Sequence, residues 1–124
     1  MLDHALIFIA EDEPFIALDL AMAVEDAGGE VLGPAGSVKE AFALLESHCV
    51  AAAILDVHLS DGDVSPVAER LLASGVPVIL QTGVAAPLAL MASFPDLIVH
   101  RKPMISENLV HQLALMVAAK KPAA

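Results

Sequence analysis

Four short apolar runs in this sequence each lead directly into polar or charged residues. The run at 50–55 is uninterrupted and closes at Asp56, after which turn-forming residues follow. Apolar runs of this length, bounded by turn signals, indicate fully buried strands of a parallel sheet. The runs and the residues after them are 5–10 with Glu11 and Asp12, 50–55 with Asp56, 76–81 with Thr82, and 97–101 with Lys102.

Helix-like segments alternate with these runs along the whole chain. Pro14 stands at a predicted helix start, and Ser37 with Glu40 three residues later is typical of a helix N-terminus. Five strands alternating with five helices predict right-handed crossovers and a parallel sheet covered on both faces. We therefore predict an α/β, flavodoxin-like (βα)5 three-layer sandwich with strand order 2-1-3-4-5 and a short or irregular fourth helix near 87–93.

This strand order would bring the polar strand ends together. The switch point between the first and third strands places Glu11 and Asp12 beside Asp56, and the next strands bring Thr82 and Lys102 to the same rim. Three carboxylates at one rim repel each other unless a cation holds them, and oxygen ligands in an open site suit Mg²⁺. A carboxylate can also act as a nucleophile toward phosphorus. Taken alone, each of these residues also fits an ordinary solvated turn or helix cap.

Length and charge exclude several classes of protein. With 124 residues, we expect a single domain over 1–124, with a flexible tail from about 118. The net charge of −10 argues against binding to nucleic acid through a basic face. The stretch 71–95 carries no charge, but Gly and Pro interrupt it too often for a membrane span. The first residues lack the basic start of a signal peptide, so a cytoplasmic location is expected.

Four motifs of the sequence resemble those of the response-regulator receiver domain of two-component signalling, in order and in approximate spacing. They are Glu11-Asp-Glu-Pro14, Ile54-Leu-Asp-Val-His-Leu-Ser-Asp-Gly62, Gln81-Thr-Gly83 and Arg101-Lys-Pro103. The resemblance implies that Asp56 accepts a phosphoryl group from a histidine kinase or a histidine phosphotransfer protein. It also implies a Mg²⁺ ion held by Glu11, Asp12, Asp56 and the backbone carbonyl of His58.

The resemblance assigns two further roles. Lys102 would pair with the phosphate, and its bond to Pro103 is expected to be cis. Thr82 would move toward the phosphoryl oxygens and couple phosphorylation to the surface made by the fourth helix, fifth strand and fifth helix, where a downstream protein partner or a second copy would bind. The family usually places Tyr or Phe three residues before the lysine, whereas this sequence has Val99 there.

The sequence therefore predicts a stand-alone response regulator, a phosphoacceptor signalling domain rather than an enzyme. It would switch partner binding or relay phosphate onward. One alternative is a receiver-shaped scaffold that binds partners without being phosphorylated. A second is an aspartyl-phosphate phosphohydrolase of the haloacid-dehalogenase type, which needs a second acid two residues after the nucleophile; this chain has His58 there.

Overall fold

The computed structural model describes residues 1–120 of the chain. The elements in chain order are β1 (Leu6–Ala10), α1 (Pro14–Asp26), β2 (Glu30–Ala35), α2 (Val38–Glu46), β3 (Ala52–Asp56), β4 (His58–Leu59), β5 (Gly62–Asp63), α3 (Ser65–Ala73), β6 (Val78–Thr82), α4 (Leu88–Ser93), β7 (Ile98–Arg101) and α5 (Ser106–Lys120). Part of the expected tail, 118–120, belongs to α5, and the remainder lies outside the described residues.

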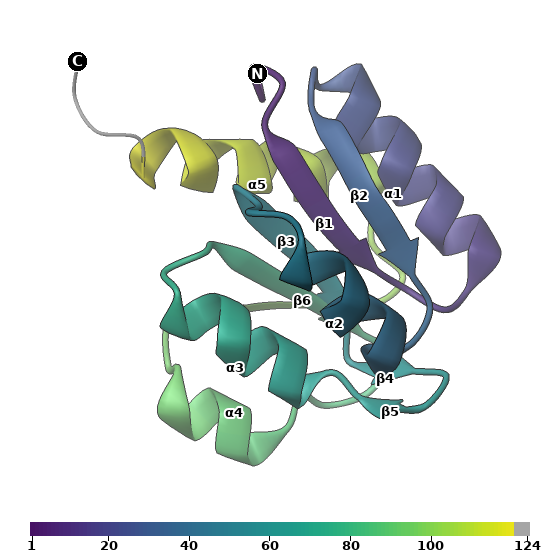
Figure 1. The fold of residues 1–124 in the computed structure, drawn as a ribbon, viewed down its shortest axis with the longest axis vertical. Coiled ribbons are helices and arrows are strands. Elements are labelled where there is room, and N and C mark those ends of the chain that lie inside the picture. The colour runs from purple at the N-terminus through teal and green to yellow at the C-terminus, as the bar shows by residue number, and fades with distance from the viewer. Residues whose placement is uncertain (121–124) are drawn as a thin grey trace.

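Five strands form one parallel sheet in the order β2-β1-β3-β6-β7, which confirms the predicted 2-1-3-4-5 arrangement. Figure 1 shows α2 and α3 in front of the sheet, while α5 passes behind it. The short strands β4 and β5 pair with each other in an antiparallel hairpin after β3, where the sequence predicted only a turn.

Two clusters of buried apolar side chains lie on the two faces of the sheet. Alternate residues of β1 divide between them, with Phe8 in the cluster beneath α2, α3 and α4 and Ile7 in the cluster beneath α1 and α5. All five residues of β3 are buried. A strand covered on both faces has no solvent-facing position, which explains why its sequence is a continuous apolar run.

Local signals define the start of α2, as predicted, and the end of α1. The Ser37 hydroxyl accepts the Glu40 N–H at 3.0 Å, and the Glu40 carboxylate accepts the Gly36 N–H at 3.0 Å. After α1 the chain turns through Gly28 with φ +86°, a left-handed conformation that favours glycine. The fourth helix is short, as expected: α4 has six residues and buries only Leu90.

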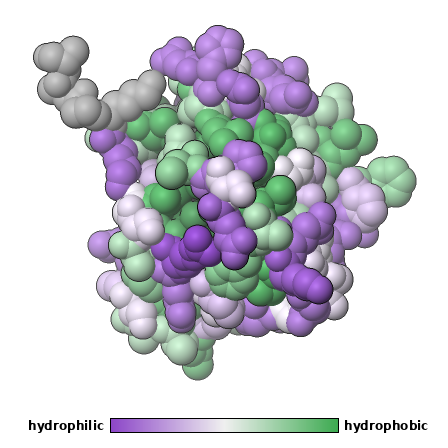
Figure 2. Space-filling view, in the orientation of Figure 1, coloured by the Kyte–Doolittle hydropathy of each residue, from purple (hydrophilic) through white to green (hydrophobic). Residues whose placement is uncertain are grey.

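The surface over α2 and α3 mixes hydrophobic and hydrophilic side chains without large separate areas of either kind (Figure 2). Within residues 1–120, no helix combines the length and the apolar character that crossing a bilayer requires. The uncharged stretch 71–95 is divided among the end of α3, the strand β6 and the short helix α4.

Candidate phosphoacceptor site

Backbone pairing brings the predicted site residues to one edge of the sheet. Leu55 lies opposite Ala10, so the next positions, Asp56 and Glu11, are neighbours at the carboxyl ends of β3 and β1. The pairing continues past the strands, since the Lys102 N–H donates to the Thr82 carbonyl at 2.9 Å. Regular strand geometry, rather than a flexible loop, therefore sets where these side chains begin.

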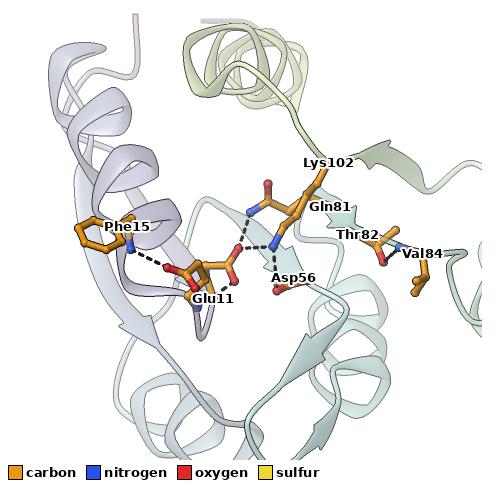
Figure 3. Close-up of polar contacts among 8 residues, drawn as sticks. Glu11, Phe15, Asp56, Gln81, Thr82, Val84 and Lys102 are labelled. Carbon is orange, nitrogen blue, oxygen red and sulfur yellow. Dashed lines mark hydrogen bonds and ion pairs between the residues drawn. The ribbon is translucent and has the colours of Figure 1, made fainter.

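Lys102 joins two of the carboxylates directly. Its Nζ lies 2.7 Å from Oε1 of Glu11 and 3.1 Å from Oδ2 of Asp56 (Figure 3). The Glu11 side chain is fully buried, while 8% of the Asp56 side chain and 21% of the Lys102 side chain are exposed. A buried carboxylate needs a charged partner and hydrogen bonds to offset its desolvation, and Lys102 supplies both. The bond from Lys102 to Pro103 is cis, as the resemblance implied.

Burial and the neighbouring charged groups shift the pKa values of Glu11 and Lys102. Burial raises the pKa of Glu11 to about 7, and the neighbouring Asp56 carboxyl adds to the increase. For Lys102, partial burial opposes the charged form, but hydrogen bonds to Glu11 and Asp56 outweigh it and raise the pKa. The lysine is therefore a fixed positive charge, whereas Glu11 gains or loses its proton near neutral pH.

Glu11, Asp12 and Asp56 form what we call the acidic cluster. One carboxylate oxygen from each lies within 4.8 Å of the others. Glu11 and Asp56 are buried and Asp12 is exposed, so the cluster is open to solvent on one side. Three converging oxygen donors with an open side fit a hard divalent cation that retains water ligands.

The other residues that the sequence analysis singled out make their contacts outside the acidic cluster. Thr82 is fully buried, and its Oγ1 accepts the Val84 N–H at 3.1 Å. In Figure 3 the threonine hydroxyl points toward Val84 and not toward the acidic cluster. The side chain of His58 is exposed on β4, and the role of its carbonyl as a metal ligand stays a prediction. Val99 is half-buried and packs against the core cluster beneath α4.

Sequence reasoning assigned no role to the Gln81 side chain, which it treated as the end of an apolar run and the first residue of the motif Gln81-Thr-Gly83. Gln81 is 3% exposed, and its Nε2 donates to Oε1 of Glu11 at 3.3 Å. It lies opposite Asp56 in the β3–β6 pairing. A polar residue at a buried strand position beside a predicted carboxylate was the signal that could have identified it.

Sequence reasoning also missed the role of Asp61. Its carboxylate accepts the N–H groups of Val38 at 2.6 Å and Lys39 at 3.1 Å, at the start of α2. These backbone hydrogen bonds lower the pKa of Asp61. The loop that follows the predicted acceptor is thereby attached to the neighbouring helix.

Comparisons with known proteins agree with the fold, although no family model matches the chain. The transcriptional regulatory protein PdtaR of Mycobacterium tuberculosis is 34% identical over 77 residues, which are 61% of this chain and 38% of that protein. The chain thus spans well under two thirds of this curated relative.

Two solved structures match over nearly their whole length. A response regulator receiver protein from Sinorhizobium medicae is 26% identical, with a TM-score of 0.81 and coverage of 98% of this chain and 100% of that one. SdrG from Pseudomonas melonis, in its BeF3-activated conformation, is 34% identical, with a TM-score of 0.69 and coverage of 94% and 99%. With this identity over nearly complete domains, the chain belongs to the response-regulator receiver domains of two-component signalling.

Proposed function

We propose that Asp56 accepts a phosphoryl group from the phosphohistidine of a histidine kinase or a histidine phosphotransfer protein. One observation carries this proposal: the Asp56 carboxylate shares its rim with two other carboxylates and accepts a hydrogen bond from the Lys102 ammonium. A lone aspartate at a strand end could be a turn former. An aspartate among cation ligands and a fixed ammonium is suited to phosphoryl transfer, which depends mainly on positioning and charge neutralisation.

The transfer conserves charge and atoms in a single displacement. A carboxylate oxygen of Asp56 forms the new O–P bond while the N–P bond of the phosphohistidine breaks, and its electron pair stays on the imidazole nitrogen. Lys102, now 3.1 Å from the Asp56 oxygen, then pairs with a phosphoryl oxygen. Mg²⁺ held by Glu11, Asp12 and Asp56 would offset the negative charge that collects on the phosphoryl oxygens.

The donor has an open approach to this site. A pocket of about 610 Å³ lies beside the site, with Lys102 and Gln81 in its wall and Phe15 and Met104 among its apolar lining residues. The aromatic side chain of Phe15 is 82% exposed. Apolar and aromatic surface next to a few convergent polar groups is typical of a binding region. We propose that the imidazole-bearing segment of the donor protein enters from this side.

For the output, we propose the face made by α4, β7 and α5. Leu88 on α4 is 87% exposed and Val84 before it is 51% exposed, which leaves apolar surface for a protein partner or a second copy. The receiver-shaped scaffold remains the second candidate, because the Thr82 hydroxyl is engaged by Val84 and β7 carries Val99 where an aromatic residue is usual in the family. In that case the same face would bind constitutively.

The experiment is direct phosphorylation. The chain is incubated with Mg²⁺ and acetyl phosphate, the intact mass is measured, and amide NMR shifts are followed with beryllofluoride, a ligand already named in the activated structure of SdrG. We expect an increase in mass of one phosphoryl group, lost in Asp56→Asn, and amide shifts near Thr82. The absence of both an adduct and shifts near Thr82 favours the scaffold, whereas repeated turnover of phosphate monoesters favours the hydrolase.

A further inference from the structure

The Glu11 carboxylate accepts hydrogen bonds from two side chains. These two donors differ in whether they can stay bonded to Glu11 when Asp56 is phosphorylated. Its Oε1 accepts from Lys102 Nζ at 2.7 Å and from Gln81 Nε2 at 3.3 Å. Its Oε2 accepts the Glu13 N–H at 3.2 Å. Because the Glu11 side chain is fully buried, any donor that leaves must be replaced or the carboxylate is left partly unsatisfied.

Gln81 is placed by the sheet and not by a flexible chain. It is buried on β6, directly opposite Asp56 in the β3–β6 pairing, yet its amide nitrogen bonds to Glu11 beyond Asp56 (Figure 3). An amide is uncharged, so it can satisfy a carboxylate oxygen without competing with a cation for the negative charge. Lys102, in contrast, carries a charge that a phosphoryl group on Asp56 would attract.

We propose that Gln81 is a positioning residue that holds Glu11 in its cation-binding orientation when Lys102 moves from Glu11 to the phosphoryl group. This inference rests on the proposed phosphorylation of Asp56. In the unmodified site, Lys102 provides the shorter, charge-assisted bond, and the amide is secondary. In the phosphorylated site, the Gln81 amide becomes the side-chain donor that remains on Oε1.

The test compares Gln81→Met with the wild type in two states. Methionine keeps the length and apolar volume but removes the amide. In excess Mg²⁺ we expect the apparent affinity for beryllofluoride, titrated by amide NMR shifts, to fall about tenfold, as for a lost hydrogen bond to a charged group. Without Mg²⁺ and beryllofluoride, Lys102 still holds Glu11, so the melting temperature should change little.

Leu80→Met is the matched control, because Leu80 is also fully buried on β6 but belongs to the core cluster on the opposite face. It should leave the affinity for beryllofluoride unchanged. If wild-type protein binds beryllofluoride and Gln81→Met binds it equally well, the positioning role is overturned while the proposed function stands. If the wild type does not bind at all, the proposed function falls and this inference falls with it.

A second measurement does not depend on phosphorylation. Lys102→Met removes the stronger donor, so adding Gln81→Met to it should lower the melting temperature more than Gln81→Met does in the wild type. Residues that share one acceptor show such non-additive effects. Equal losses in the two backgrounds would mean that Gln81 is only a packed core residue, which overturns the proposal.

Discussion

Gln81 and Thr82 are adjacent on β6 but point to opposite faces of the sheet. We call the face of Gln81 the acceptor side and that of Thr82 the output side, after the proposed function. The two sides differ in the hydrogen bonds that their polar side chains already make. On the acceptor side, Gln81 and Lys102 both bond to Glu11, and Lys102 also bonds to Asp56. On the output side, the Thr82 hydroxyl bonds to the backbone of its own loop. Neighbouring strand residues point to opposite faces of the sheet, so one strand serves both sides without linking them.

This difference separates the two parts of the proposed function, phosphorylation of Asp56 and the response of Thr82. The side chains of the acceptor side are already held by strand pairing and by the ion pairs of Lys102 with Glu11 and Asp56. Under the proposed function, the Thr82 hydroxyl on the output side would exchange its bond from the Val84 N–H for one to a phosphoryl oxygen. A phosphoryl group can shift that equilibrium only by its preference for the second arrangement. The following substitutions and conditions test the two sides separately.

Lys102→Met should have the largest effect, because it removes the only positive side chain bonded to Glu11 and Asp56 within residues 1–120. We expect phosphorylation by acetyl phosphate to slow about a hundredfold, as for loss of one charge-stabilising donor. The metal-free protein should also lose about 2 kcal/mol of unfolding free energy, since two buried carboxylates remain uncompensated. Thermal unfolding with and without Mg²⁺ measures this loss. Because Mg²⁺ can compensate the carboxylates that have lost Lys102, it should stabilise the variant more than the wild type, and a smaller stabilisation of the variant would contradict the prediction.

The pH dependence of cation binding should be the next largest effect. Burial raises the pKa of Glu11 from 4.5 to about 7, so the folded chain retains a proton that the unfolded chain releases in this window. Metal-free stability should therefore fall as the pH rises from 4.5 to 7. Mg²⁺ needs the ionised carboxylate, and its affinity should rise roughly tenfold between about pH 6 and about pH 8.

Isothermal titration with Mg²⁺ at the two pH values measures this change, and Glu11→Gln is the control. The variant cannot ionise at position 11, so its weaker Mg²⁺ binding should depend much less on pH. An equal pH dependence in both proteins would show that another group controls cation binding.

Thr82→Ala tests the output side and should have a moderate effect. The substitution removes the acceptor of the Val84 N–H, at a cost of about 1 kcal/mol. Phosphorylation of Asp56 should continue, since the threonine does not bond to the acidic cluster. Amide shifts caused by beryllofluoride should persist around Asp56 but disappear from α4 and β7. Persistence of the α4 shifts would mean that the signal bypasses Thr82.

Asp61→Ala should have the smallest effect of the four. It removes the side-chain acceptor from the first N–H groups of α2 without touching the acidic cluster. We expect a small decrease in melting temperature and unchanged phosphorylation. Because hydrogen bonding lowers the pKa of Asp61, the wild-type advantage should be present at neutral pH and be lost in acid, as the carboxylate becomes protonated.

The fold could be predicted from the sequence because the signals for its strands and helix ends are local. The continuous apolar run that became β3, the glycine at 28 and the cap at Ser37 each depend on residues within a few positions. Alternation of such elements leaves few topologies for a parallel sheet of this size. The hairpin of β4 and β5 was not predicted, since two-residue strands have no periodicity to detect.

The residues that reach the rim could be identified from the sequence, since the side chains after buried strands must emerge at the carboxyl edge of the sheet. The hydrogen bonds between these side chains could not be predicted in the same way and became visible in the folded chain. Folding placed Lys102 between Glu11 and Asp56, gave Glu11 the Gln81 amide as a second donor, and directed the Thr82 hydroxyl to Val84. These choices depend on burial and on which donors lie within hydrogen-bond reach across different strands, and sequence spacing carries neither.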